Sequence, residues 1–256
     1  MSQLIENLGV SKWPEVIDRR QKARIIRKEL LEDEKKKVQM DPAHKVDPDI
    51  ELQYYNAVND VGISACQRNE FLQAHVDFSQ CYEQYQKWGN EQTHALEYAK
   101  YYHNMAYVRM YEGKYKDAID LAQKGVDLVE PGTARYCWFQ YDLACIILQS
   151  GNPQQALELH LNVLSLGKEI CGGRSSFYLM SEYTVGAMYH HIGNLELAEK
   201  YIRLCVNNAE QYGWNREPLS RARLHLARIL RGVDEIGLRD DIRRYEKMLG
   251  VLSKNS

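Results

Sequence analysis

The segment Gly113-Lys-Tyr115-Lys-Asp-Ala118 belongs to a short pattern that occurs four times in the chain. Each copy has a turn-forming residue, an apolar or ring residue two positions later, and an alanine five positions later. The other copies are Asn69-Glu-Phe71-Leu-Gln-Ala74, Gly151-Asn-Pro153-Gln-Gln-Ala156 and Gly193-Asn-Leu195-Glu-Leu-Ala198. Successive alanines are 44, 38 and 42 residues apart (74 to 118, 118 to 156, 156 to 198). The pattern therefore marks an internal repeat.

A small residue that follows an apolar one lies seven positions before each turn residue. The pairs are Val61-Gly62, Met105-Ala106, Leu143-Ala144 and Val185-Gly186. Apolar residues between the turns recur at steps of three and four, which is the period of an α-helix. We therefore expect two helices per repeat that cross closely at the small residues, joined by a turn in which Gly or Asn tolerates a positive φ. Neither helix can bury its apolar stripe alone, so the repeats must stack.

At these positions the chain resembles the tetratricopeptide repeat (TPR) family, whose signature is W-x₂-L-G-x₂-Y, then A-x₃-F, then P. The best copy has Tyr102, Met105, Ala106, Gly113, Ala118, Ala122 and Pro131 at matching places. No copy keeps the tryptophan, and the period exceeds the usual length of about 34 residues. The longer repeat is similar to that of kinesin light chains and of bacterial signal-transducing regulators. The resemblance covers roughly residues 50–210 and implies an all-α, right-handed superhelical solenoid of antiparallel helix pairs.

The sequence divides into three parts. Residues 1–48 are expected to form a charged helix over 11–40 and a linker that ends at Asp47-Pro48, a favourable helix start. Residues 49–213 hold four TPR-like helix pairs, and residues 214–256 a degenerate fifth pair (217–231 and 236–250) and a cap. In the first helix Ser11 is a candidate cap, and the candidate apolar stripe consists of Trp13, Ile17, Ile26, Leu30 and Leu31.

Two segments are locally basic. From Arg19 to Lys37 there are nine Lys/Arg and four Asp/Glu, which fits a nuclear-localisation or anion-binding patch, or a solvated helix whose stripe caps the solenoid. Near the other end, the arginines are Arg216, Arg221, Arg223, Arg228 and Arg231. They would suit an acidic or phosphate-bearing ligand, although a terminal repeat needs a polar outer face in any case.

Composition excludes several classes of protein. The chain has 256 residues, 45% of them hydrophobic, and a net charge of −2, which argues against a disordered chain and disfavours nucleic acid as the partner. We expect no signal peptide and no transmembrane helix, because no continuous apolar run has the required length. Six cysteines form no C-x-x-C pair, so free thiols and a cytoplasmic location are expected, with the nucleus as the alternative.

In the TPR family the first helix of each pair lines the concave surface. The resemblance therefore implies a ligand-binding groove made by first-helix side chains. The candidates are Lys100, His103, Asn104, Tyr107, Tyr111, Trp138, Tyr141, Tyr183, His190, Arg221 and Arg228. Aromatic rings with polar tips are typical of interaction hot spots, so a peptide with apolar anchors and an acidic part would fit, and so would a flat small molecule. Alternatively, the helices bury these rings between repeats.

Motifs for catalysis, metals and cofactors are absent from the sequence. There is no H-E-x-x-H and no paired-cysteine motif, and adjacent His190 and His191 diverge by about 100° on a helix. We expect no metal and no cofactor, and we read Cys171-Gly-Gly-Arg174 as a loop. Asp142 would repel a carboxylate where chaperone-binding TPR proteins have a basic residue, so no chaperone-tail clamp is expected.

The sequence thus favours an adaptor or scaffold that binds a peptide segment of a partner protein, and disfavours an enzyme. The alternative is an atypical enzyme or small-molecule receptor that uses the aromatic, His and Arg side chains of the groove. Pairing of two copies through an end repeat stays open.

Overall fold

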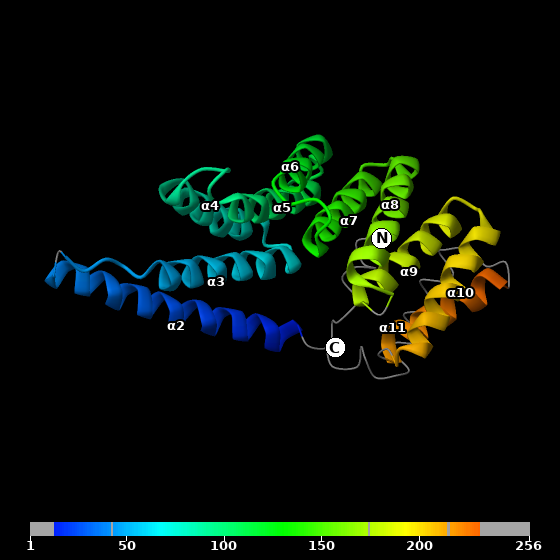
Figure 1. Cartoon of the computed structure of the whole chain (residues 1–256), viewed down its shortest axis with the longest axis horizontal. Helices are drawn as coiled ribbons and strands as arrows, with labels where there is room; N and C mark the ends of the chain where they lie inside the picture. The colour runs from blue at the N-terminus through cyan, green and yellow to red at the C-terminus, as the bar shows by residue number, and fades with distance from the viewer. Residues whose placement is uncertain (1–12, 42, 174, 214–215, 231–256) are drawn as a thin grey trace. The chain divides into compact units, whose positions relative to one another are not determined.

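The computed structural model of the chain describes residues 13–41, 43–173, 175–213 and 216–230, and Figure 1 shows it as a succession of helices. These residues form helices and contain no strand, which confirms the all-α prediction. The helices are α2 (Trp13–Met40), α3 (Pro48–Gln67), α4 (Phe71–Trp88), α5 (Ala95–Tyr111), α6 (Tyr115–Asp127), α7 (Ala134–Gln149), α8 (Pro153–Cys171), α9 (Ser176–His191), α10 (Leu195–Gln211) and α11 (Arg216–Leu230). The predicted helix over 236–250 lies outside the described residues.

The chain forms two compact units. Among the described residues, the N-terminal unit comprises those from 13 to 128 and holds α2 to α6, and the C-terminal unit holds α7 to α11. In the N-terminal unit each helix packs on the next one along the chain, and the same is true in the C-terminal unit. Each unit is therefore built from consecutive helix hairpins, as the repeat predicted.

The hairpins turn at the residues that the repeat singled out. Asn69 has a φ of 63°, Gly113 of 75°, Gly151 of 92° and Gly193 of 83°. These values lie in the left-handed region, where glycine has no Cβ penalty and asparagine is the best-tolerated substitute. The four turns join α3 to α4, α5 to α6, α7 to α8 and α9 to α10, which confirms the predicted helix pairs.

Side-chain caps begin many of the helices. The N–H of Asp49 donates to the carboxylate of Asp47 (2.9 Å), with Pro48 in the first turn of α3, so the predicted start of this helix is confirmed. Other side-chain oxygens accept a hydrogen bond from the third residue of their helix. They belong to Thr133, Asn152, Ser175 and Asn194 and begin α7, α8, α9 and α10. Such caps satisfy amide groups that have no partner within the helix.

Small residues lie where paired helices cross. A Cβ on Gly62 would lie 2.6 Å from Cε1 of Phe78, and a Cβ on Gly186 would lie 2.7 Å from the side chain of Ile202 and 3.0 Å from its backbone nitrogen. The two alanines at the equivalent places, Ala106 and Ala144, are fully buried. The alanines of the second helices are fully buried as well: Ala74, Ala118, Ala156 and Ala198. The predicted close crossings are therefore confirmed.

Replacing Gly186 with alanine is expected to lower the free energy of unfolding of the C-terminal unit by about 1 to 3 kcal/mol, because the new methyl group overlaps the backbone of α10. Alanine's better helix propensity, worth about 1 kcal/mol, offsets only part of this loss. Urea unfolding followed by circular dichroism measures the effect. Asn207→Ala, at an exposed position of α10, is the control, and an unchanged or raised stability of Gly186→Ala would contradict the close crossing.

The first and the fourth hairpin each contain a buried cysteine thiol that donates to a main-chain carbonyl of the paired helix. The Cys81 thiol donates to the carbonyl of Tyr55, and the Cys205 thiol to the carbonyl of Leu179, both at 3.4 Å. Each cysteine lies seven residues after its hairpin alanine. Burial raises the pKa of both thiols to about 12, so these cysteines are packing residues.

The N-terminal unit uses tyrosine as a core residue. Five tyrosines are buried there: Tyr54, Tyr55, Tyr85, Tyr98 and Tyr102. Several keep a partner for the hydroxyl; for example, Tyr98 donates to the carbonyl of Gly89 (3.1 Å), and Tyr55 to Oε1 of Gln84 (3.3 Å). These tyrosines therefore fill the interior of the N-terminal unit, and several of them keep their hydroxyl groups near polar partners.

Helix α2 runs alongside α3 (Figure 1) but does not bury the predicted apolar stripe. Leu31 is buried and Ile17 is half-buried, whereas Ile26 and Leu30 are 57% and 49% exposed. Arg20, Arg24 and Arg27 of α2 contact α3 and α4 instead. The prediction of a buried apolar stripe was therefore wrong for Ile26 and Leu30. Ser11 and the side chain of Trp13 lie outside the described part. No described helix has the length and apolar character needed to cross a bilayer.

Candidate functional site

In the N-terminal unit, the first helices α3 and α5 meet through polar side chains. The amide of Asn104 on α5 donates to Oδ1 of Asn59 on α3 at 2.6 Å, and Lys100 Nζ lies 3.4 Å from Oδ1 of Asn56. Asn59 and Asn104 are both buried. The prediction that Asn104 faces a ligand is therefore wrong: its amide holds two first helices together, whereas Lys100 is half-buried at the edge of this pair.

Three predicted rings of α5 keep part of their surface accessible. His103 and Tyr107 are half-buried and pack edge to face with ring centroids 5.3 Å apart. Tyr111 is also half-buried and stacks on Phe71 of α4, with centroids 5.0 Å apart. His103 and Tyr107 lie one turn apart on the same face as Lys100. This face combines a cation, an imidazole and a phenol, which suits a ligand that carries hydrogen-bond acceptors.

In the C-terminal unit, Trp138 of α7 is a candidate aromatic ring that is exposed to solvent. It is 41% exposed. Its orientation is nevertheless fixed, because its ring packs on Phe177 of α9 with centroids 4.6 Å apart and on Tyr141 with centroids 6.3 Å apart. An indole held by its neighbours and open to solvent loses little conformational entropy when a partner covers it.

Tyr141, three residues further along α7, lies inside the protein. It is 4% exposed, its hydroxyl is 2.9 Å from Oγ1 of Thr184, and its ring packs edge to face on His160 at 4.9 Å. Burial raises the pKa of Tyr141 well above its ordinary value. The prediction that Tyr141 faces a ligand is therefore wrong, because helices α8 and α9 cover it.

A buried polar chain connects α9 and α11. Nδ1 of His190 lies 2.9 Å from Nε2 of His225, and Nδ1 of His225 lies 3.3 Å from the hydroxyl of Tyr183. His190 and His225 are buried, and Tyr183 is half-buried. The structure thus brings the predicted residues Tyr183 and His190 together through His225, which the sequence analysis did not select.

The predicted arginines of α11 are buried as well. Arg221 is 6% exposed and Arg228 is 9% exposed, so neither presents the open basic surface that was predicted. Arg221, His225 and Arg228 recur with the helical period, and this spacing could have placed His225 on their face. Arg223 is exposed and donates to Glu210 at 2.7 Å. Arg231 and the side chain of Arg216 lie outside the described part.

Cys145 on α7 lies next to His160 on α8, with Sγ 4.0 Å from Nε2. Both side chains are buried. Burial raises the pKa of the Cys145 thiol and lowers the pKa of His160 to about 4. At neutral pH the pair is a thiol beside a neutral imidazole, which is not an activated nucleophile.

Within the described ranges, no three His, Cys, Asp or Glu side chains group closely enough to hold a metal ion. Arg174, part of the segment that we read as a loop, lies outside these ranges, and its neighbours Cys171 to Gly173 end α8 and form a turn. Each unit therefore has its own candidate surface. One is the Lys100, His103 and Tyr107 face of the N-terminal unit, and the other is Trp138 in the C-terminal unit.

No family model matches the chain, and no curated protein matches its sequence. Solved structures do match. BtubC from P. vanneervenii has a TM-score of 0.65 at 11% identity, covering 95% of this chain and 93% of that one. A putative kinesin light chain of nearly identical TPR-like repeats from Podosopora anserina has a TM-score of 0.58 at 16% identity, covering 78% and 97%. A Rap protein complexed with competence and sporulation factor has a TM-score of 0.55 at 14% identity, covering 93% and 73%. Likeness at these identities concerns the fold.

Proposed function

We propose that this chain, an all-α TPR-like helical repeat, is a protein-interaction module that binds a segment of a partner protein through its first helices. The observation that carries the proposal is Trp138, a large ring that is 41% exposed and yet held by Phe177 and Tyr141. The Rap protein whose structure the chain resembles was solved in complex with competence and sporulation factor, which supports a binding role for this fold.

The chemistry of the two faces indicates what the partner segment carries. Trp138 supplies a flat apolar surface, so the partner contributes an apolar or aromatic side chain that covers it. In the N-terminal unit, Lys100, His103 and Tyr107 can donate hydrogen bonds, so this face favours a segment with carboxylates or exposed carbonyl groups. Each face is thus matched to a peptide segment by its own chemistry. Tyr141 and Asn104 no longer belong to the binding surface, because both are buried.

The proposal predicts that Trp138→Ala loses the partner. Removing a hot-spot tryptophan typically costs about 2 kcal/mol or more, which weakens binding by about 30-fold. The test is affinity capture from an extract of the source cells, with mass spectrometry of the proteins that wild type retains.

A matched control is Leu204→Ala in the same unit. Leu204 lies on the second helix α10 and is 39% exposed, close to the value for Trp138. Circular dichroism establishes that both variants are folded. A protein that Leu204→Ala retains and Trp138→Ala loses supports the proposal. If capture by Trp138→Ala equals that by wild type, the first-helix face does not bind this partner, and the small-molecule alternative takes its place.

A further inference from the structure

Helix α2 is attached to the N-terminal unit in two different ways along its length. In its C-terminal half, Leu31 is buried among core tyrosines, and Glu34 is buried between Lys37 and His44, whose Nε2 lies 2.9 Å from its carboxylate. In its N-terminal half, no side chain of residues 14–30 is fully buried. That half is held by arginines.

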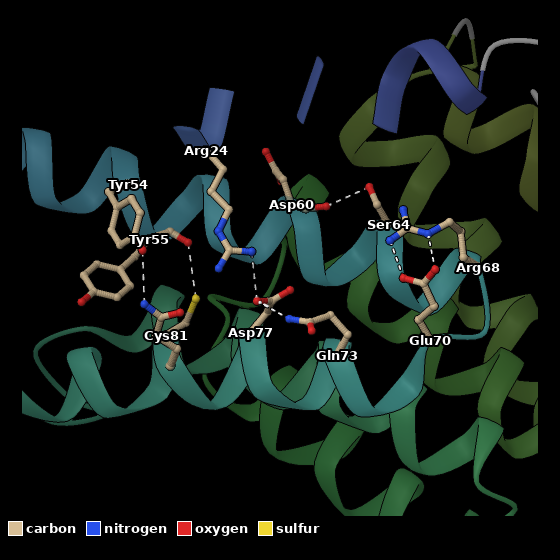
Figure 2. Close-up of polar contacts among 11 residues, drawn as sticks. Arg24, Tyr54, Tyr55, Asp60, Ser64, Arg68, Glu70, Gln73, Asp77 and Cys81 are labelled. Carbon is tan, nitrogen blue, oxygen red and sulfur yellow. Dashed lines mark hydrogen bonds and ion pairs between the residues drawn. The ribbon is translucent and has the colours of Figure 1, made fainter. Parts of the chain in front are cut away.

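Three arginines at positions i, i+4 and i+7 make these contacts. Nη1 of Arg20 donates to Oγ of Ser64 at 2.9 Å, Nη1 of Arg24 lies 3.2 Å from Oδ1 of Asp77, and Nη1 of Arg27 lies 3.4 Å from the carbonyl of Gln53. Residues at this spacing share one face of a helix. Figure 2 shows Arg24 reaching from α2 across α3 to Asp77 on α4.

The atoms that these arginines contact are hydrogen-bond acceptors. They are a hydroxyl oxygen, a carboxylate and a main-chain carbonyl, and the hydroxyl of Ser64 donates its own proton to the carbonyl of Asp60 at 3.1 Å (Figure 2). Gln67 adds an amide oxygen 3.5 Å from Nη1 of Arg20. A surface with this set of acceptors is complementary to guanidinium groups, each of which offers five donors and no acceptor.

Asp77 is the centre of this surface, and α2 satisfies it incompletely. The carboxylate is fully buried, and Oδ1 takes both the contact with Arg24 and a hydrogen bond from Gln73 Nε2 at 3.1 Å. Oδ2 is buried without a hydrogen-bond partner. Burial raises the pKa of Asp77 despite the opposing charge of Arg24, so the single contact from Arg24 does not fully offset the loss of water. An arginine that reaches both carboxylate oxygens would stabilise the site further.

We infer that the α3–α4 face around Ser64 and Asp77 is a docking site for an arginine-bearing helix of a partner protein. The N-terminal half of α2 occupies this site in the free chain, and a partner helix with arginines at i, i+4 and i+7 replaces it. The residues of this surface do not include Trp138, Lys100, His103 or Tyr107, so the inference does not depend on the proposed function.

Exchange of the helix can be tested with a fluorescent peptide of residues 13–40 added to the full chain. In wild type the attached α2 competes for the site. In the Arg20→Ala/Arg24→Ala chain this competitor is weakened, so the peptide is expected to bind at least about tenfold more tightly than to wild type. Hydrogen exchange on the same variant should show faster exchange in residues 14–30 and unchanged protection in α3 and α4.

Two controls isolate the arginines. The chain variant Lys22→Ala removes an exposed cation of α2 that pairs with Asp18 and should bind the peptide as wild type does. A peptide with both Arg20 and Arg24 replaced by alanine should not bind the Arg20→Ala/Arg24→Ala chain. In a double-mutant cycle, Arg24→Ala should speed hydrogen exchange in residues 14–30 less in a chain that already carries Asp77→Asn than in wild type.

Three outcomes would overturn the inference. The first is undiminished protection of residues 14–30 in Arg20→Ala/Arg24→Ala, since arginines would then not hold this half of α2. The second is faster hydrogen exchange in residues 14–30 of the Arg20→Ala/Arg24→Ala chain without any binding of the peptide to that chain. The third is equal binding of the peptides with and without arginine, which would indicate non-specific association.

Discussion

Replacing Phe78 with alanine is expected to lower the free energy of unfolding of the N-terminal unit by about 3 to 5 kcal/mol. Phe78 is 1% exposed and fills the space that Gly62 leaves at the crossing of α3 and α4. Its ring also joins a core cluster with Met105 and Val108 of α5. The truncation therefore removes contacts with both α3 and α5 and leaves a cavity. Such a loss is a large part of the total stability of an ordinary domain.

Urea unfolding followed by circular dichroism measures this effect. Leu72→Ala on the same helix is the control, because Leu72 is 82% exposed and its removal should change stability by no more than about 0.5 kcal/mol. Similar losses for the two variants would contradict the placement of Phe78 between the helices of the first hairpin.

Replacing His160 with leucine is expected to reduce the sensitivity of the C-terminal unit to acid. His160 is fully buried on α8, and burial lowers its pKa from 6.5 to about 4. The folded protein binds a proton at His160 less readily than the unfolded chain does. The contribution of neutral His160 to the free energy of unfolding is therefore fully present above pH 6.5, and it is lost as the pH falls from 6.5 through about 4. The difference between the two pKa values corresponds to about 3 kcal/mol.

The measurement is the free energy of urea unfolding at pH 7 and pH 4. Wild type should lose about 3 kcal/mol more than His160→Leu between these conditions. Gln155→Leu, at an exposed position of the same helix, tests whether an added leucine alone alters the pH profile. Equal losses in wild type and His160→Leu would show that His160 does not carry this part of the acid sensitivity.

The hairpins were predictable because their requirements are local. A positive φ at Asn69, Gly113, Gly151 and Gly193 demands a glycine or asparagine, and a close helix crossing at Gly62 or Gly186 demands a small residue. Each requirement selects a residue type at a fixed distance along the chain, and four copies made the pattern visible.

Exposure of the candidate site residues was not predictable in the same way. Trp138 and Tyr141 lie three residues apart on α7, yet one is 41% exposed and the other 4%. The difference arises because Thr184 and His160, which belong to neighbouring helices and are distant in sequence, cover Tyr141. His225 was missed for the same reason, since its contact with His190 joins residues 35 positions apart.

Helix α2 illustrates a different limit. Its arginines suggested a solvated or anion-binding surface, and its aliphatic residues suggested the buried stripe. In the structure Arg20 and Arg24 contact α3 and α4, whereas Ile26 and Leu30 are exposed. A buried carboxylate on another helix, Asp77, reverses the usual preference of arginine for water, and no local pattern reveals such a carboxylate.

The most direct test of the proposed binding role is the dissociation constant of a purified partner segment, measured by titration calorimetry against wild type, Trp138→Ala and Leu204→Ala. The account predicts binding about 30-fold weaker for Trp138→Ala and unchanged for Leu204→Ala. Equal dissociation constants for wild type and Trp138→Ala would contradict it and would remove Trp138 from the binding surface.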